Sequence, residues 1–306
     1  MAELRLYHLD VFAERPYQGN PLAVVVGGED LPSEAMQAIA RELHLSETAF
    51  VLPAGERDGA VARLRIFTPT VEMPFAGHPS VGSAWLLTRL GRAPAEFAFD
   101  VAAGRLAAVV EGAQLQGPAW VRAPRPRPAE VEDPGALTAA VLATAGLAER
   151  DLAGPGPELW STGNEHHLTL LRPGTDLAML RPDLGALAGT LGERGWLVAS
   201  FDEPGRARVR YFAPGLGVAE DPGTGSAAAA FVGYLAARHP EALDGGRLRI
   251  AQGAELGQPS VLHAAWRDDE AWIGGTCHLL YQAELLTPGQ RSDGPPGGQY
   301  HAREGE

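Results

Sequence analysis

Short hydrophobic segments, several with alternating hydrophobic and polar positions, recur along the chain and predict β-strands. They are rich in β-branched and aromatic residues, and they read RLYHLDVF (5–12), LAVVV (22–26), TAFVL (48–52), ARLRIF (62–67), RVRYF (208–212) and RLRIA (247–251). The stretch from Glu96 to Gly112 predicts a β-hairpin that turns near Gly104.

Helical segments lie between these strands. The first is expected at Ser33–His44, with Ser33 as N-cap after Pro32, and the second at Pro79–Leu90, with proline in its first turn. Two more are expected at Pro182–Gly192 and Thr224–Arg238. The pattern predicts an α+β protein.

Three motifs occur twice in the same order, which indicates an internal duplication. GNPLAVVV (19–26) resembles GNEHHLTLL (163–171), RIFTP (65–69) resembles RYFAP (210–214), and GHPSVGSAWLL (77–87) resembles DPGTGSAAAAF (221–231), at offsets of 144, 145 and 143 residues. The third match aligns Gly82-Ser83-Ala84 with Gly225-Ser226-Ala227. We expect two related halves, 1–122 and 130–278, whose helix N-termini face one cleft.

Prolines and glycines mark the segments between and after these halves. The join is expected in the proline-rich stretch 117–136, where five prolines discourage regular structure. The Gly/Pro-rich tail 291–306 is expected to be disordered.

Composition narrows the class of protein. The chain has 306 residues, of which 45% are hydrophobic and 21% charged, as in soluble globular proteins. It has no apolar run of about 20 residues and no signal-peptide core at its start, so we expect a cytoplasmic protein. The net charge of −13 argues against nucleic acid or an anionic membrane as the main partner.

Two scarce residue types exclude several chemistries. Cys277 is the single cysteine, which excludes an intrachain disulfide, a cysteine-rich zinc site and a racemase with two cysteines. The chain has no lysine, which excludes Schiff-base enzymes, the pyridoxal-phosphate class and a GxxxxGK[ST] P-loop.

The duplicated glycine turns are the first candidate site. In GTGS (223–226) the missing Cβ atoms allow a ligand close to the backbone, and helix N-termini favour an anion. Tight helix packing is the alternative, but two such turns facing one cleft favour a bound carboxylate. GHPSVG has one residue too many for a GxSxG nucleophile elbow, which makes a serine hydrolase a poor candidate.

Among the histidines, one is a candidate site residue and none is expected to bind a metal ion. His78 stands at a helix start, where it could donate a hydrogen bond or carry a proton, although a structural role is an equal alternative. His166 and His167 are neighbours on a strand, so they point to opposite faces and cannot bind one metal ion.

The remaining candidate site residues are acidic. Glu47 lies between an amphipathic helix and an apolar strand, where loss of hydration would raise its pKa and suit it to proton transfer; a surface acid is the alternative. The second half has Gly195-Trp196-Leu197 at that place and no acid. Asp221 could be a helix cap, but Glu220 and Asp221 beside an anion site also point to a substrate that carries an amine or hydroxyl donor.

Together these motifs resemble the PhzF family of phenazine-biosynthesis proteins, relatives of diaminopimelate epimerase. The resemblance rests on GNPLAVV, LSETAFV, RIFTPTVEMPFAGHPSVGSA, EDPGTGSAAAAF and QGAELGQPS, from about Leu6 to Pro259. It implies two pseudo-symmetric halves, each a β-sheet rolled around a central helix, with the active site in the cleft between them. It also implies that a last strand near 279–288 completes the first half, and that the protein is a homodimer.

The resemblance further implies a cofactor-free, metal-free isomerase. By matching motifs, Glu47 would be the general acid/base and His78 and Asp221 would contact polar groups of a small carboxylate substrate. Gly77, Gly225, Ser226 and Asn20 would also bind it. The substrate would be trans-2,3-dihydro-3-hydroxyanthranilate or a close relative.

Departures from the epimerase pattern refine this expectation. Where the epimerase has a catalytic cysteine in each glycine turn, this chain has Ala76 and Pro222, which favours a proton shift over two-base epimerisation. Two alternatives remain: an isomerase or epimerase of the same fold acting on an unrelated amino or hydroxy acid, and a non-catalytic protein that binds a small carboxylate.

Overall fold

The computed structural model describes residues 4–55, 59–112, 116–154 and 156–286, so the predicted tail 291–306 lies outside them. Its helices are α1 (Ser33–Leu43), α2 (Gly77–Arg89), α3 (Pro134–Ala145), α4 (Leu184–Leu191) and α5 (Gly225–Arg238). Its strands are β1 (Leu4–Val11), β2 (Asn20–Val26), β3 (Thr48–Pro53), β4 (Ala62–Phe67), β5 (Glu72–Met73), β6 (Glu96–Val101), β7 (Gly104–Val110), β8 (Ala119–Arg122), β9 (Arg127–Pro128), β10 (Glu158–Ser161), β11 (Glu165–Leu170), β12 (Gly195–Glu203), β13 (Arg206–Phe212), β14 (Arg247–Gln252), β15 (Ser260–Arg267), β16 (Glu270–Gly275) and β17 (Cys277–Leu285).

The predicted strands are confirmed. All six segments fall within β1, β2, β3, β4, β13 and β14, allowing for a residue at the ends, and β6 and β7 form the predicted hairpin with Gly104 at a φ of 128°. The strands of the described residues hydrogen-bond into one connected sheet, in which the last strand, β17, pairs antiparallel with the first, β1.

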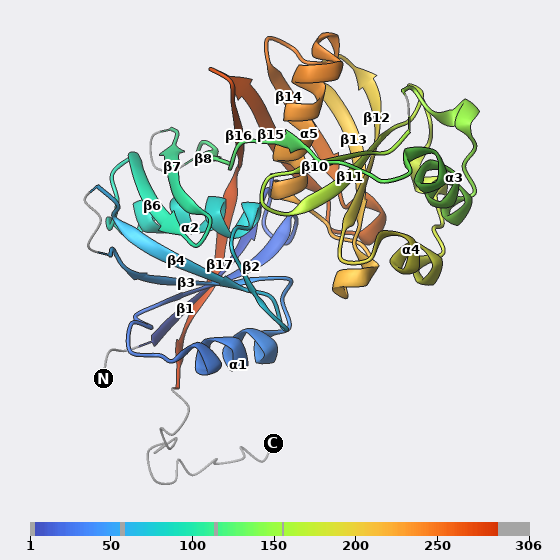
Figure 1. The fold of residues 1–306 in the computed structure, drawn as a ribbon. Helices are drawn as coiled ribbons and strands as arrows, with labels where there is room; N and C mark the ends of the chain where they lie inside the picture. The colour runs from blue at the N-terminus through green and yellow to red at the C-terminus, as the bar shows by residue number, and fades with distance from the viewer. Residues whose placement is uncertain (1–3, 56–58, 113–115, 155, 287–306) are drawn as a thin grey trace, which may run out of the picture.

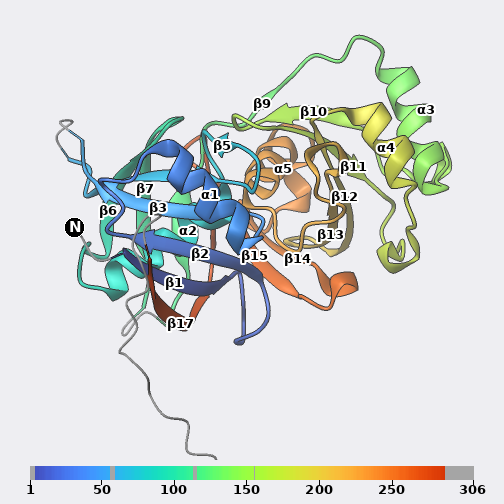
Figure 2. The same ribbon diagram turned by 90° about the horizontal axis from the view of Figure 1, so that it is seen from below.

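Two helices, α2 and α5, are buried, one at the centre of each of two lobes. Helix α2 packs against β1, β2, β3, β7 and β8, helix α5 packs against β9, β10, β11 and β15, and both helices contact β16. Figure 1 shows them in two lobes: a first lobe with α1, α2, β1–β8 and β17, and a second lobe with α3–α5 and β9–β16. In Figure 2, α5 lies among the strands of the second lobe. Residues 77–87 and 225–235 are buried throughout, and apart from His78 their side chains are mostly small or apolar, as a helix buried on every side requires.

Helix boundaries correct some details of the predictions. Helix α1 begins at Ser33, but its N-cap residue is Pro32, and no side chain caps it. Ser33 instead accepts a hydrogen bond from Arg65, so the predicted N-cap serine is wrong. Helix α4 is capped by Asp183, whose carboxylate accepts from the amide of Ala186.

The proline-rich join is more ordered than predicted. It contains β8, which pairs with β7 and β16, and its end overlaps α3. Helix α3 has Asp133 as a capping side chain, Pro134 in its first turn and Gly146 at its C-cap with a φ of 67°. Proline in the first turn favours a helix start, because the missing N–H has no intrahelical partner there.

Strand pairing repeats at corresponding residues of the two lobes. In the first lobe β2 and β3 pair in parallel with Ala23 opposite Thr48, and in the second β11 and β12 pair in parallel with His167 opposite Trp196. The next pair is also equivalent, because Ala49 opposes Ile66 and Leu197 opposes Tyr211. This register places Gly195, directly before Trp196, where the first lobe has Glu47, directly before Thr48.

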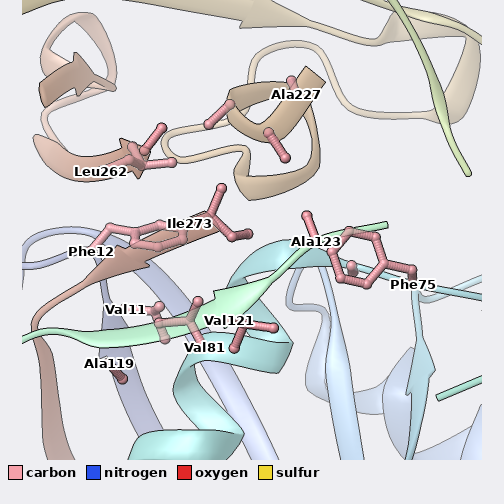
Figure 3. Close-up of a cluster of buried hydrophobic side chains, with 14 of the residues drawn as sticks. Val11, Phe12, Phe75, Val81, Ala119, Val121, Ala123, Ala227, Leu262 and Ile273 are labelled. Carbon is pink, nitrogen blue, oxygen red and sulfur yellow. The ribbon is translucent and has the colours of Figure 1, made fainter. Parts of the chain in front are cut away.

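One hydrophobic cluster runs between the lobes. It includes Val81 of α2 and Ala227 of α5, and Figure 3 shows Phe12 and Ile273 lying between them. The two buried helices therefore share a continuous core. No helix of the described residues is long and apolar enough to cross a membrane.

Candidate active site

The N-termini of α2 and α5 meet through two glycines. A Cβ atom added to Gly77 would lie 2.6 Å from the Cα of Gly225, and one added to Gly225 would lie 2.8 Å from the Cα of Gly77. Only glycine allows this approach. The first N–H groups of both helices, which lack intrahelical partners, are thus concentrated in one place, where their dipoles favour an anion.

This contact corrects the alignment of the third repeat. Gly77 and Gly225 are each the first residue of a buried helix, so Gly225-Ser226 corresponds to Gly77-His78 and not to Gly82-Ser83. Gly82 lies one and a half turns into α2, where an added Cβ would clash with Leu22 and Val11. The Gly-Ser-Ala sequence shared by the two helices therefore predicts an alignment that the structure does not have.

Glu47 and His78 lie side by side at this helix junction. Glu47 directly precedes β3, and its Oε2 lies 3.5 Å from Nδ1 of His78 at the start of α2. The Glu47 side chain is 21% exposed and that of His78 4%. Burial raises the pKa of Glu47 to about 7, and burial lowers the pKa of His78 to about 4 despite the nearby Asp221. Near neutral pH the pair is therefore a carboxyl group poised for proton transfer beside an uncharged imidazole.

Asp221 joins this pair from the second lobe. One carboxylate oxygen accepts from Nδ2 of Asn20 at 3.0 Å, and the other accepts from the hydroxyl of Thr224 at 2.5 Å. Burial and the charge of Glu47 raise the pKa of Asp221 to about 6. The N-cap residue of α5 is Thr224, so the alternative of Asp221 as helix cap is wrong.

The neighbouring acid, Glu220, has a different partner. Its two carboxylate oxygens accept from Nε and Nη2 of Arg210, both at 2.8 Å, with side-chain exposures of 10% and 7%. Nη1 of Arg210 donates to the carbonyls of Leu177 and Leu180. Glu220 is neutralised by this ion pair, which leaves Asp221 as the acid of the turn that faces Glu47.

Replacing Glu220 by Gln is expected to destabilise the protein by about 3 kcal/mol, because it leaves the buried Arg210 without its counter-charge. Glu72→Gln is the matched control, since Glu72 pairs with Arg65 but is 37% exposed, and its loss is expected to cost less than about 1 kcal/mol. Urea denaturation at pH 7 measures both. Equal losses for the two variants would contradict the burial argument.

The sequence analysis assigns no role to Gln252, the last residue of β14, but in the structure it holds the turn of residues 221–224 in place. Its Nε2 donates to the carbonyl of Asp221 at 2.7 Å and to the hydroxyl of Thr224 at 3.0 Å, and its Oε1 accepts from the amide of Thr224. Gln252 opens the motif QGAELGQPS, and that was its only signal, because no spacing rule connects it with residues 221–224.

Tyr211 and His166 occupy the place in the second lobe that corresponds to Glu47. A Cβ atom at Gly195 would collide with the Tyr211 hydroxyl, which lies 2.9 Å from Nδ1 of His166. Burial, together with the charges of Asp221 and Glu47, raises the pKa of Tyr211, so its hydroxyl keeps its proton. The second lobe therefore has no acid to mirror Glu47, as the sequence predicted.

The remaining predicted residues lie around the same junction. Ser226 is 6% exposed, and its carbonyl accepts from the hydroxyl of Thr162. Asn20 is 1% exposed and has both amide hydrogens engaged, with Asp221 and with the carbonyl of Gly223. Cys277 is buried, which raises the pKa of its thiol. The described part of the chain has no group of three His, Cys, Asp or Glu side chains that could hold a metal ion.

An open depression of about 380 Å³ lies elsewhere, between β7, β8 and the β15–β16 turn. Two pairs of its charged side chains form ion pairs there, Arg122 with Glu270 and Arg125 with Asp269. Because the charges of each pair neutralise one another, the helix junction, with its buried carboxyl groups, is the better candidate for chemistry.

Comparison with known proteins identifies relatives over most of the chain. The family model PhzC-PhzF, described as phenazine biosynthesis-like protein, matches residues 9–275. The chain is 38% identical over 269 residues to trans-2,3-dihydro-3-hydroxyanthranilate isomerase of Pseudomonas aeruginosa, covering 84% of this chain and 88% of that protein. It is 32% identical over 296 residues to the uncharacterized isomerase YddE of Escherichia coli, covering 92% and 97%.

Solved structures agree with this relationship. A predicted epimerase from Pseudomonas aeruginosa superimposes with a TM-score of 0.76 at 34% identity, covering 94% of this chain and all of that one. A hydroxyproline epimerase from Agrobacterium vitis superimposes with a TM-score of 0.62 at 14% identity, covering 94% and 95%, which shows a shared fold alone. The predicted epimerase-like α+β fold is confirmed.

Proposed function

The chain is an isomerase of the PhzC-PhzF phenazine biosynthesis-like family, and from this we propose that it moves a proton between two carbons of a small cyclic amino or hydroxy carboxylate. The substrate we propose first is trans-2,3-dihydro-3-hydroxyanthranilate, because the 38% identical relative bears the name of its isomerase. The observation that carries the proposal is the pairing of a buried Glu47 with His78 at the helix junction, with no acid at the corresponding place in the second lobe.

We propose that the active site lies between two pseudo-symmetric halves, each a sheet rolled around α2 or α5. The repeated strand registers and the contact between Gly77 and Gly225 support this arrangement. The halves would be residues 1–122, completed by β17, and residues 130–278. In this reading each half contributes one helix N-terminus to the site.

The substrate carboxylate would bind at the joined helix N-termini, near Gly77, Gly225 and Ser226. Amide N–H groups and helix dipoles stabilise an anion there without a basic side chain. Asp221 would accept a hydrogen bond from the substrate amine or hydroxyl, and His78, uncharged near neutral pH, would donate one to a substrate oxygen.

Glu47 would take a proton from one ring carbon and return it to another on the same face. When the C–H bond breaks, its electron pair enters the conjugated system, and the new C–H bond uses the pair at the far end, so no oxidant or reductant is needed. The hydrogen-bond donors around the carboxylate would stabilise the developing charge. The reaction requires neither cofactor nor metal, and we expect the protein to act as a homodimer.

Proton NMR in heavy water tests this function. Incubation with trans-2,3-dihydro-3-hydroxyanthranilate is expected to give the isomerised product with deuterium at one ring carbon. Because the acid that removes the proton also returns it, part of the product should keep the original hydrogen. A product fully deuterated from the first turnover would contradict a single acid shielded from solvent.

The uncharacterized isomerases among the relatives favour one alternative, a different cyclic amino or hydroxy acid as substrate. If the first compound is inert, exchange of a carbon-bound hydrogen in another small carboxylate would assign this alternative. Tight binding of a carboxylate with no exchange would assign the non-catalytic role.

The pH dependence of kcat/KM is expected to follow the two raised carboxyl pKa values. Glu47 must be ionised to remove a proton, so kcat/KM should fall about tenfold per pH unit below its pKa of about 7, and more steeply below about 6, where Asp221 also gains a proton. Initial rates from pH 5 to pH 9, corrected for titration of the substrate, measure this. A plateau that extends down to pH 5 would contradict the assignment of Glu47 as base.

A further inference from the structure

The chain has two asparagines, and they occupy corresponding positions in the two lobes. Asn20 follows Gly19 at the start of β2, and Asn164 follows Gly163 directly before β11. Both glycines have left-handed backbone conformations, with φ of 81° and 103°. Each Gly-Asn pair therefore turns the chain in a similar way into the strand that follows it.

Asn20 crosses from the first lobe to the second. One amide hydrogen bonds to Oδ1 of Asp221 and the other to the carbonyl of Gly223, both at 3.0 Å, while its Oδ1 lies 3.4 Å from the Ser46 hydroxyl. Its two donor hydrogens are both used within the protein. A substrate would have to break one of these bonds to accept a hydrogen bond from the Asn20 amide.

Asn164 crosses in the opposite direction. Its Nδ2 donates to the carbonyl of Phe75 at 3.2 Å. Phe75 lies two residues before Gly77, the first residue of α2, just as Gly223 lies two residues before Gly225, the first residue of α5. Each asparagine therefore holds the turn that leads into the other lobe's central helix.

We propose that Asn20 and Asn164 are positioning residues that act as reciprocal ties between the lobes and hold the two helix N-termini together. Asn20 would fix Asp221 as well, because its second hydrogen has a carboxylate partner that Asn164 lacks. This replaces substrate binding as the role of Asn20. Its catalytic consequence rests on the proposed function, but the ties themselves do not.

Hydrogen–deuterium exchange with mass spectrometry tests the ties without a substrate. Asn20→Ala is expected to speed exchange at least about fivefold in peptides covering 221–226, as loss of one net hydrogen bond implies, and Asn164→Ala to do so in peptides covering 75–80. This crossed pattern distinguishes ties between lobes from local damage. Thr162→Val is the control, because Thr162 bonds to Ser226 of its own lobe, so it should leave 75–80 unchanged.

Acceleration confined to the peptides around each substituted residue would overturn the proposal. Asn20→Ser and Asn164→Ser provide smaller changes if the alanine variants unfold, and they should give the same crossed pattern. A wild-type protein that turns over no carboxylate would refute the proposed function and leave this exchange result standing.

Kinetics separate the two asparagines. Both alanine variants are expected to raise KM by about fivefold, because the helix N-termini lose their fixed spacing. Only Asn20→Ala removes a hydrogen bond to the Asp221 carboxylate, which should raise the pKa of Asp221 further. The fall of kcat/KM on the acidic side of its pH profile should therefore begin at a higher pH in this variant. The other titratable groups that face Asp221 are Glu47, His78 and Tyr211, and both variants keep them. If KM rises in Asn20→Ala while the acidic side of its kcat/KM profile stays where it is in wild type, Asn20 would instead be a residue that binds the substrate.

Discussion

Glu47→Gln is expected to lower turnover about a thousandfold, because an amide can neither take nor return the proton that moves between the substrate carbons. Glutamine keeps nearly the same shape beside His78, so the substrate should still bind with a similar KM. The heavy-water NMR assay measures the loss as reduced product and reduced deuterium uptake. Glu72→Gln, on the surface of the first lobe, should retain full activity. Equal turnover by Glu47→Gln and wild type would show that another group is the acid/base.

The same substitution is expected to stabilise the fold at high pH. The folded-state pKa of about 7 lies above the ordinary value of 4.5, so the folded protein binds this proton more tightly than the unfolded chain does. The stability that Glu47 contributes is present below pH 4.5 and lost as the pH rises through 7. At pH 8 the glutamine variant should therefore be more stable than wild type by about 3 kcal/mol.

Urea denaturation of both proteins at pH 4.5 and pH 8 measures this difference, which should vanish at the lower pH. A carboxyl group that weakens the fold while performing the chemistry is the expected signature of an active-site acid. A variant destabilised equally at both pH values would indicate that Glu47 has a packing role instead.

Local sequence signals predicted the secondary structure well because the chain uses them consistently. Alternating strands such as ARLRIF became β4, and the starts of α2 and α5 lie within two residues of the predicted ones. The signals of α3 are equally clear, with Asp133, Pro134 and Gly146 in capping positions, but the prolines around them also predict a linker. Proline stops a helix in its interior and favours one at its first turn, so position decides its meaning.

The site was predictable where a residue's environment follows from its neighbours in sequence. Glu47 precedes an apolar strand, and its raised pKa follows from that burial. The structure also brings it to His78 and Asp221, which the family resemblance had grouped with it.

Contacts between distant residues were not predictable in this way. The partners of Asp221 include Asn20, which is 201 residues away, and Gln252, and no local pattern indicates either one. Similarly, Glu220 and Arg210 lie only ten residues apart, but they pair only because strand β13, which carries Arg210, runs beside the turn that carries Glu220. A single sequence shows which groups are available, while the fold decides which of them meet.

The junction of the two central helices leads to the second large effect. Gly225→Ala is expected to destabilise the protein by about 3 kcal/mol and to lower turnover by at least about a hundredfold. The added Cβ would lie 2.8 Å from the Cα of Gly77 and 3.1 Å from the amide nitrogen of His78. Both are backbone atoms of α2, so no side-chain rotation relieves the clash and the helix N-termini must move apart.

Gly189→Ala is the matched control, because it makes the same chemical change inside a helix. Gly189 lies in α4, and an added Cβ would have nothing within 4 Å beyond its own helix backbone, so alanine should stabilise the protein by up to about 1 kcal/mol and leave turnover unchanged. Thermal denaturation and steady-state kinetics measure both variants. Gly77→Ala should reproduce the loss, since its Cβ would lie 2.6 Å from the Gly225 backbone. Wild-type stability and KM in Gly225→Ala would mean that the two helices do not meet at these glycines, and the shared anion site would have to be abandoned.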